Sequence, residues 1–266
     1  MLHNTGQSLI NYDLIGPPEA PVVCMTHSLT SDYGMWAEQV PSILAEGFQV
    51  LRVDMRGHGG STPTKGEYTI EGLAADVISV LDALGFDKGV HLIGLSMGGM
   101  IGQVIAADYP GRLASLMACC TAAKWAGDTE LMLGRLAAVK ASGTLESIVS
   151  ANMERRYGAG YRERRPKRWE ALRETFLGTS LDGYFGCMHA CLTHNVEDRL
   201  QNIDIPTLVV AGSADLSTPP SDNKLIASKI KGARYVEMKD GYHFPNIEFD
   251  EDFNRIMVDW LRKVRG

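Results

Sequence analysis

The sequence predicts an α/β fold, in which a mostly parallel sheet is flanked by helices and interrupted by one helical insertion. Two observations support this prediction. Short apolar runs of strand character alternate with longer helical patterns in the first half of the chain and again near its end, and such alternation builds βαβ units and parallel sheets. Residues 123–198 break the alternation, because they are helical in composition and hold no strand-like run. We therefore expect a core at 1–122 and 199–266, and a cap at 123–198.

In the first half, the segment 8–16 is expected to form an antiparallel hairpin at the sheet edge. Leu73, Val77 and Leu81 recur at helical spacing, which predicts a helix over 70–85. A second helix is expected at 98–108. The apolar runs predict buried strands at 21–26, 49–54, 90–95 and 115–120.

After the insertion the alternation resumes, with helices expected around 222–230 and 250–264. Inside the insertion, Pro166 lies in a charged patch and predicts a helix break. An insertion that leaves and rejoins one end of a sheet is well placed to cover a site there. The remaining strands are expected at 207–212 and 234–238.

Composition narrows the classes of partner. A chain of 266 residues suits one large α/β domain or a core with a cap. The formal charge is −6, with 26 Lys and Arg against 32 Asp and Glu, so nucleic acid and anionic membranes are disfavoured as partners. We expect a small-molecule substrate and either a monomer or a homodimer.

Compartment is inferred from the cysteines and the N-terminal segment. The five cysteines are an odd number and lie partly in apolar runs, which indicates small core residues in a reducing compartment. The first residues lack the basic and apolar regions of a secretory signal, and no run approaches the ~18 apolar residues of a membrane span. The expected location is cytoplasmic.

Residues 94–99, Gly-Leu-Ser-Met-Gly-Gly, contain a G-x-S-x-G pattern. The pattern alone is weak, because it also occurs by chance. Here it follows a predicted strand and precedes a predicted helix, and a serine at such a turn is forced into strained geometry that exposes its hydroxyl. Gly94 and Gly98 are expected because a side chain at either position would collide with the neighbouring strand or helix. Ser96 is therefore the candidate nucleophile.

A serine hydroxyl needs a positioned base, and in this arrangement the acid and then the histidine follow the serine in the chain. Of the histidines after Ser96, only His243 follows a strand through a short loop and precedes the closing helix. Asp215 lies on the loop after the strand 207–212 and could accept the ring N–H of that histidine. Asp222 and Asp240 are less suited, since one lies in the next helix and the other is too near His243 in sequence.

Tetrahedral intermediates need two hydrogen-bond donors. The N–H of Met97, directly after the nucleophile, is one, and the loop after the strand 21–26 should supply the second through the Leu29 N–H. Ser28 in the same loop is a candidate substrate contact. We interpret His27 as a structural residue of this loop. The same scaffolding role is expected for Asp54, Arg56 and His58.

The chain carries the motifs HSLTSDYGMW, VDMRGHGGST, GLSMGGMIGQ and IDIPTLVVAGSADLSTPP. Through these motifs the chain resembles the α/β-hydrolase superfamily, and within it most closely the 3-oxoadipate enol-lactone hydrolases. The resemblance covers most of the chain and is weaker across about 123–180. The resemblance implies the α/β-hydrolase fold with an eight-stranded sheet, the triad Ser96, Asp215 and His243, and a cap built from the insertion. The sequence departs from that family at two places. Its oxyanion loop reads HSLT where the lactonases tend to have NSLG, and its histidine loop has the aromatic residues Tyr242 and Phe244 where the lactonases usually have smaller ones.

The cap offers candidate substrate contacts. Arg155 and Arg156 align roughly with a basic and aromatic stretch of the lactonase cap, and a guanidinium there could grip a substrate carboxylate; a solvated helix end is the alternative. Trp125 and Tyr184 would line an apolar pocket or simply hold the cap to the core. Phe244, beside the candidate base, completes the set of candidate contacts.

Cys187, His189 and Cys191 lie close enough in sequence to suggest a metal site. The surrounding pattern is helical, and structural zinc usually draws on two separated ligand pairs, of which only one exists here. We therefore expect neither a metal nor another cofactor.

The sequence thus favours a serine hydrolase that cleaves an ester or lactone through an acyl-enzyme, and the resemblance favours an enol-lactone-like ring. Three alternatives stay open: a receptor-like or ligand-binding α/β-hydrolase with slow turnover, a cofactor-free perhydrolase, and a C–C bond hydrolase.

Overall fold

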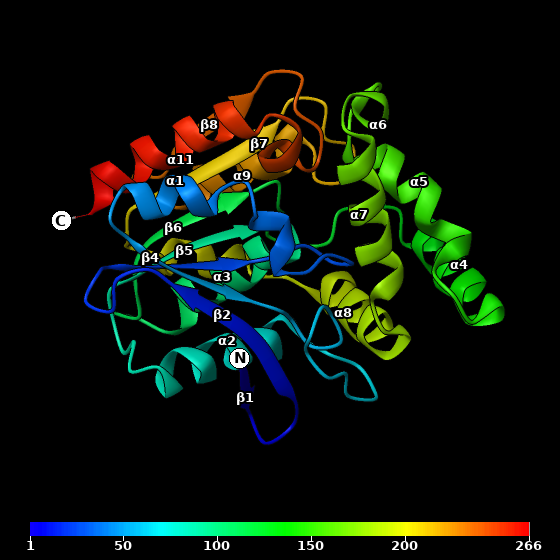
Figure 1. Ribbon diagram of the computed structural model, residues 1–266, viewed down its shortest axis with the longest axis horizontal. Helices are drawn as coiled ribbons and strands as arrows, with labels where there is room; N and C mark the ends of the chain where they lie inside the picture. Colours follow the sequence, from blue (N-terminus) through cyan, green and yellow to red (C-terminus); the bar gives the residue numbers. More distant parts are fainter. Residues whose placement is uncertain (266) are drawn as a thin grey trace.

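The computed structural model describes residues 1–265 and is built on an eight-stranded sheet in the order β1-β2-β4-β3-β5-β6-β7-β8 (Figure 1). β1 and β2 form an antiparallel edge, and the pairs from β4 to β8 are parallel. The predicted mostly parallel sheet is confirmed. The strands are β1 (Leu2–Asn4), β2 (Leu9–Ile15), β3 (Val22–Thr26), β4 (Gln49–Val53), β5 (Val90–Leu95), β6 (Leu113–Cys119), β7 (Thr207–Gly212) and β8 (Arg234–Met238).

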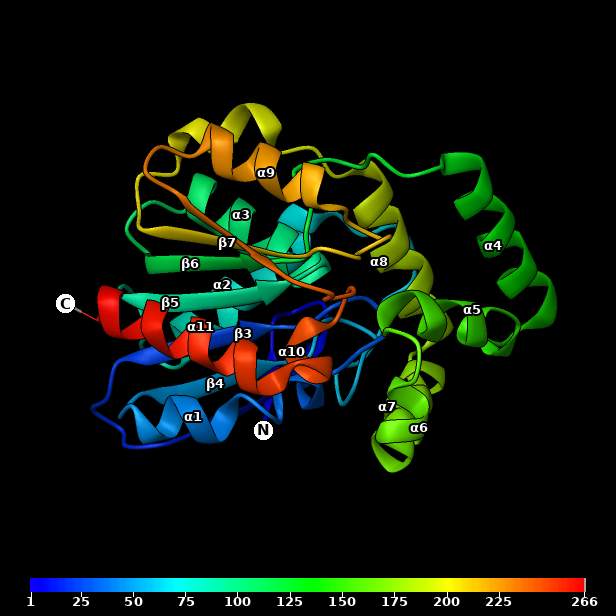
Figure 2. The same cartoon turned by 90° about the horizontal axis from the view of Figure 1, so that it is seen from above.

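Helices cover both faces of the sheet (Figure 2). One face carries α1 (Val40–Ala45) and α11 (Asp250–Val264), and the other carries α2 (Ile70–Ala83), α3 (Met97–Asp108) and α9 (Pro220–Lys229). Shorter turns complete the core: η1 (Tyr33–Trp36), η2 (Glu197–Asn202) and α10 (Pro245–Glu248).

Two hydrophobic clusters hold the sheet between these layers. Side chains alternate along a strand, so Cys24 and Leu92 face the cluster under α2 and α3, whereas Val23 and Ile93 face the cluster under α11. All four are essentially inaccessible to solvent, and burying a side chain of this size stabilises the fold by about 1.5–3 kcal/mol. The central strands are thereby fixed, and so are the loops at their carboxyl ends.

The insertion between β6 and β7 is helical. It comprises α4 (Thr129–Ser142), α5 (Glu146–Arg156), α6 (Tyr161–Arg164), α7 (Pro166–Gly178) and α8 (Leu181–Thr193). These helices lie together at one end of the sheet (Figure 2). The predicted break at Pro166 is confirmed, because α6 ends just before it and α7 begins on it.

The two ends of the insertion are tied together. An isolated antiparallel bridge pairs Lys124 with Asn195. On either side of it, the Trp125 N–H donates to the His194 carbonyl over 3.1 Å, and the Val196 N–H donates to the Ala123 carbonyl over 2.8 Å. We refer to these two paired segments, 123–125 and 194–196, as the neck. The chain thus leaves and re-enters the core at one place.

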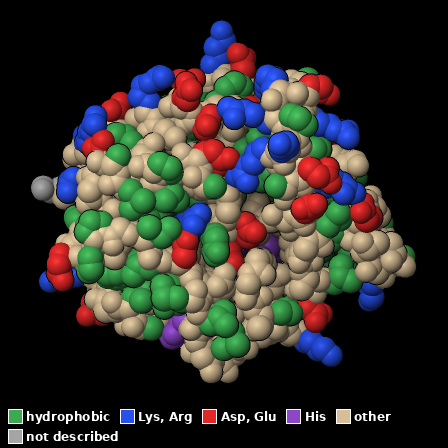
Figure 3. Space-filling view, in the orientation of Figure 1, with side chains coloured by type: hydrophobic (Ala, Val, Ile, Leu, Met, Phe, Trp, Pro, Cys, Tyr) green, Lys and Arg blue, Asp and Glu red, His purple; other side chains and the backbone are tan. Residues whose placement is uncertain are grey.

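Acidic and basic side chains are interspersed over the face seen in Figure 3. The charged patch around Pro166 follows this pattern, since Arg164 pairs with Glu248 and Arg168 pairs with Glu38. All five cysteines are free and buried. None of the helices described between residues 1 and 265 has both the length and the apolar character needed to cross a bilayer.

Candidate active site

Ser96 stands alone between the last residue of β5 and the first residue of α3, with φ 57° and ψ −116°. That region is unfavourable for a residue with a Cβ. The two glycines that flank it permit the turn. A Cβ on Gly94 would lie 2.2 Å from the Gly98 carbonyl oxygen, and a Cβ on Gly98 would lie 2.2 Å from the Thr26 carbonyl oxygen. β5, α3 and β3 therefore approach one another more closely than any side chain would allow.

The turn is held by hydrogen bonds from the next strand. The Ser96 N–H donates to the Cys119 carbonyl over 2.9 Å, and the Thr121 hydroxyl donates to the Ser96 carbonyl over 2.7 Å. The Ser96 backbone is thereby fixed, while its side chain lines a cavity. The N-terminus of α3 also places partial positive charge beside this hydroxyl.

Asp215 follows β7, and His243 follows β8. The Nδ1 of His243 lies 2.8 Å from Oδ2 of Asp215. The other oxygen, Oδ1, accepts hydrogen bonds from the N–H groups of Ser217 and Thr218, over 2.7 and 3.1 Å. Because both strands end at the same edge of the sheet, residues 28 apart in the chain form one buried pair.

The Asp215 carboxylate is almost fully buried. Burial by itself would raise its pKa, but the charge and hydrogen bond of His243 and the N–H groups of Ser217 and Thr218 outweigh burial and lower the pKa below its usual value. The carboxylate therefore stays ionised, as required of a group that orients a histidine and stabilises its protonated form.

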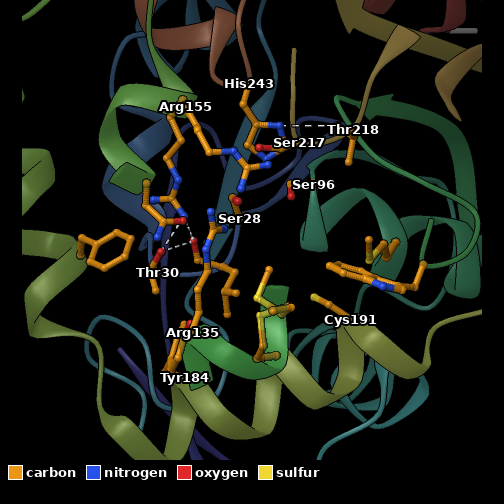
Figure 4. A pocket seen from close by; sticks show the side chains of 18 residues that line it. Ser28, Thr30, Ser96, Arg135, Arg155, Tyr184, Cys191, Ser217, Thr218 and His243 are labelled. Atoms are coloured by element: carbon orange, nitrogen blue, oxygen red, sulfur yellow. Dashed lines mark hydrogen bonds between the residues drawn. The ribbon is translucent and has the colours of Figure 1, made fainter. Parts of the chain in front are cut away.

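One cavity of about 120 Å³ joins these groups to the cap. Figure 4 shows Ser96 and His243 close together at its wall, with cap side chains opposite. No hydrogen bond joins Ser96 to His243 within residues 1–265, and such contacts often tighten only when substrate binds. The volume is several times the ~30 Å³ that one water molecule occupies in the liquid, so the cavity has the size of a small organic molecule.

The loop after β3 lines the same cavity with Ser28, Leu29 and Thr30. The Leu29 N–H has no hydrogen-bond partner among the described residues. The Met97 N–H is the first of α3 and so has no acceptor within the helix. Two backbone donors are therefore available near Ser96.

Thr30 in the same loop adopts φ 55°, a left-handed conformation that non-glycine residues rarely take.

The cavity is positively charged. Arg135 of α4 and the consecutive residues Arg155 and Arg156 of α5 all line it, and no Asp or Glu is among the described residues that do so. Arg156 is buried, which lowers its pKa to about 10. An anionic ligand would gain from these charges.

The remaining sequence candidates separate into two groups. Trp125 and Tyr184 line the cavity with Ser96, as does Ser28. Phe244 does not. Its ring is 1% exposed, stacks on His243 at a centroid distance of 5.3 Å and borders a neighbouring cavity. We therefore place Phe244 behind the histidine as a packing residue and no longer as a substrate contact.

Three of the residues interpreted as scaffold bind neighbouring segments. His27 accepts a hydrogen bond from the Met55 N–H, and Asp54 accepts one from the Tyr33 N–H. Arg56 pairs with Asp76.

Sequence reasoning missed two residues of this site. Thr218 donates from its hydroxyl to Oδ2 of Asp215 over 2.8 Å, and Arg135 reaches the cavity from α4 of the cap. The signals that could have found them were a hydroxyl three residues after the acid and a cation in the middle of the largely apolar run of α4.

The Cys187–His189–Cys191 cluster lies on α8. Cys187 and Cys191 belong to the hydrophobic cluster under α2 and α3, and Cys191 also lines the cavity with Ser96. Nδ1 of His189 contacts the Tyr68 carbonyl at 3.0 Å. Within residues 1–265, no group of three His, Cys, Asp or Glu side chains is placed to hold a metal ion.

Comparison with known proteins is consistent with this geometry. Residues 21–250 match the family model described as alpha/beta hydrolase fold. The chain is 31% identical to 3-oxoadipate enol-lactonase 2 of Acinetobacter baylyi, over 96% of this chain and 93% of that one. Its structure is similar to the enol-lactonase from Burkholderia xenovorans LB400, with a TM-score of 0.94, 34% identity and coverage of 98% and 100%. A malate-bound thermophilic esterase from Thermogutta terrifontis matches with a TM-score of 0.90 and 27% identity, covering 99% and 97%.

Proposed function

This chain belongs to the α/β-hydrolase family and is a hydrolase; from that premise we propose that it cleaves a small carboxylic ester or lactone through an acyl-enzyme. Ser96 is the nucleophile, His243 the base and Asp215 the acid that orients the base. The observation that supports this most strongly is the buried His243–Asp215 pair, 2.8 Å apart, at the cavity that the strained Ser96 also lines.

In the proposed reaction, the Ser96 oxygen attacks the substrate carbonyl while Nε2 of His243 takes the hydroxyl proton. The Leu29 and Met97 N–H groups stabilise the resulting oxyanion. Collapse of the tetrahedral intermediate breaks the C–O bond, and the protonated histidine gives its proton to the leaving oxygen. Water, deprotonated by His243, then attacks the acyl-enzyme and releases the acid and free Ser96. In a lactone the leaving oxygen stays attached to the acyl chain.

We infer further that the substrate carries a negative charge and is an enol-lactone-like cyclic ester. The three cavity arginines support the charge, and the enol-lactonase relatives support the ring. Arg135 and Arg155 would attract the substrate carboxylate. Trp125 and Tyr184 would bound its apolar part, and Ser28 would contact it from the oxyanion loop.

The triad is tested with Ser96→Ala, using 4-nitrophenyl butyrate as a neutral ester. We expect turnover to vanish while the circular dichroism spectrum and the unfolding midpoint stay unchanged. Ser228→Ala, in an exposed position on α9, should retain full activity. A fluorophosphonate should label Ser96 and no other serine, as read by mass spectrometry. Retained turnover in Ser96→Ala refutes the proposal.

The substrate charge is tested by comparing 4-nitrophenyl butyrate with its anionic counterpart, 4-nitrophenyl hydrogen succinate. We expect a higher kcat/KM for the succinate, and Arg135→Gln and Arg155→Gln should raise KM for the succinate alone. Equal kcat/KM values for both esters contradict the charge assignment. Turnover far below about 1 s⁻¹ on a whole panel of esters and lactones would favour the ligand-binding alternative.

A further inference from the structure

Arg156 connects the cap to the loop that follows β3. Its Nη2 donates to the Leu29 carbonyl over 2.8 Å and to the Thr30 hydroxyl over 2.6 Å. The guanidinium carbon lies 5.0 Å from the centre of the Phe176 ring and 4.9 Å from that of the Phe244 ring. The last residue of α5 is therefore clamped between two aromatic rings and aimed at the backbone of the candidate oxyanion loop.

The same residue also contacts the histidine loop. The Phe244 N–H donates to the Arg156 carbonyl over 3.1 Å, directly after His243 in the chain. One cap residue thus binds a loop that offers an oxyanion donor and the loop that holds the base. Its neighbour Arg155 donates to the Leu216 carbonyl over 3.1 Å, next to Asp215.

The loop after β3 needs an external anchor. A non-glycine residue in the left-handed region costs on the order of 1–3 kcal/mol and persists only where its surroundings over-determine it. Thr30 is such a residue, and the backbone bond that closes its own loop runs from the Ser31 N–H to the Ser28 carbonyl, at 3.2 Å. The two bonds from Arg156 are charge-assisted, and such bonds are roughly twice as strong as neutral ones.

Arg156 also lacks the partner that an ordinary structural arginine would have. Within residues 1–265 no carboxylate pairs with it, although it is buried, whereas Arg168, which also joins the cap to the core, pairs with Glu38. Burying a cation without a counter-ion is costly. A purely mechanical attachment of the cap would be served better by a paired or apolar residue.

We propose that Arg156 is a positioning residue for the oxyanion hole: by holding the Leu29 carbonyl and the Thr30 hydroxyl, it fixes the loop backbone so that the Leu29 N–H faces the substrate carbonyl oxygen. This inference rests on the function proposed above. If Arg156 acts in this way, it raises kcat even for a substrate that carries no charge. The oxyanion hole then forms correctly only when α5 is in place.

The test uses Arg156→Met and Arg156→Lys on 4-nitrophenyl butyrate, which carries no carboxylate. We expect Arg156→Met to lower kcat by about 10–100-fold, with KM changed by less than about threefold, because removal or misplacement of one oxyanion donor costs up to about 10²–10³ in rate. Lysine keeps the positive charge and one donor nitrogen and should recover part of the loss. Affinity for a trifluoromethyl ketone, whose hemiketal oxygen occupies the oxyanion hole, should fall in parallel with kcat.

Arg168→Met is the matched control. It removes a cap arginine whose hydrogen bonds go to the Gly34 carbonyl and Glu38 and not to Leu29, Thr30 or the histidine loop, so kcat should stay within about twofold of the parent. An equal loss in Arg168→Met overturns the inference, because general cap attachment would then explain both.

An Arg156→Met effect confined to KM for the anionic succinate also overturns the inference, since Arg156 would then be only a carboxylate contact. If the methionine variant fails to fold, Arg156→Lys decides alone: lowered kcat with weakened ketone binding supports the inference, and parental values refute it. These outcomes are separate from failure of the proposed function, which appears as turnover in Ser96→Ala.

Discussion

Gly183 of the cap packs backbone against backbone on Gly57 of the core. A Cβ on Gly183 would lie 2.6 Å from the Gly57 Cα, and a Cβ on Gly57 would lie 2.4 Å from the Gly183 Cα. The Ser180 N–H and hydroxyl both donate to the Gly57 carbonyl, each over 3.0 Å. The start of α8 therefore sits on the core with no room for a methyl group.

We expect Gly183→Ala to push α8 away from the core and to destabilise the protein by about 1–3 kcal/mol, the usual cost of overpacking. The measurement is urea unfolding. Gly134→Ala in α4 is the matched control, because a Cβ on this helical cap glycine would meet nothing within 4 Å, and the substitution should stabilise the protein slightly. Equal stability of Gly183→Ala and the parent would show that the contact is not tight.

Gly98→Ala should be more harmful than Gly102→Ala, although both lie in α3. The new methyl group at 98 would meet the Thr26 carbonyl, which is backbone, whereas the one at 102 would meet the ends of the Leu92 and Leu116 side chains. We expect Gly98→Ala to lower kcat by about 100-fold or more, because a shift of about 1 Å at the nucleophile costs that much. Gly102→Ala should lose stability but retain most of its kcat. Similar kcat values for both variants would count against the close packing of the nucleophile turn.

Thr218→Val tests the support of the acid. The valine keeps the shape but removes the hydroxyl that donates to Oδ2 of Asp215, the oxygen that also faces His243. A hydrogen bond to a charged group contributes about 1.5–3 kcal/mol. We expect kcat/KM on 4-nitrophenyl butyrate to fall by about tenfold or more, with unchanged circular dichroism. Unaltered kcat/KM would mean that the two N–H groups and His243 suffice.

His58 predicts a pH dependence of stability. Its ring is fully buried, and burial, aided by His27 nearby, lowers its pKa to about 3. Between pH 6.5 and 3 the unfolded chain therefore binds a proton that the folded protein does not. The stability from neutral His58 is complete above pH 6.5 and is lost as the pH falls below it, by up to about 1.4 kcal/mol per pH unit.

We therefore expect His58→Gln to lose about 1 kcal/mol less than the parent between about pH 7.5 and 5.5, as measured by urea unfolding at both values. The comparison concerns the difference between two pH values, so a general destabilisation by the substitution does not affect it. Identical losses in both proteins would show that His58 is protonated in the folded state.

The core and the positions of the candidate triad were predictable from the sequence, because each depends on local signals. The strand, the glycines and the helix around Ser96 identify the turn, and the chain order selects Asp215 and His243. Gly94 and Gly98 have the close contacts that the motif predicts, one with the helix and one with the neighbouring strand.

The cap was not predictable in the same detail. In α4 only Val139 is buried, so hydrophobic spacing does not indicate which face of that helix meets the rest of the protein. The contacts of Arg156 with Leu29 join residues 127 apart, and the burial of Phe244 depends on α5 lying above it. Such contacts arise from the packing of distant segments, on which the local pattern carries no information.

The neck has a consequence for how this protein could change over evolutionary time. Since the strands and the cap meet in the chain through one short paired crossing, from Lys124 to Asn195, a recombination event or an engineered graft that swaps everything between those points leaves the sheet's connectivity intact. Such an exchange would replace the cap residues that line the cavity while the core keeps Ser96, Asp215 and His243. On the role proposed for Arg156, the new cap must also supply an arginine at that position.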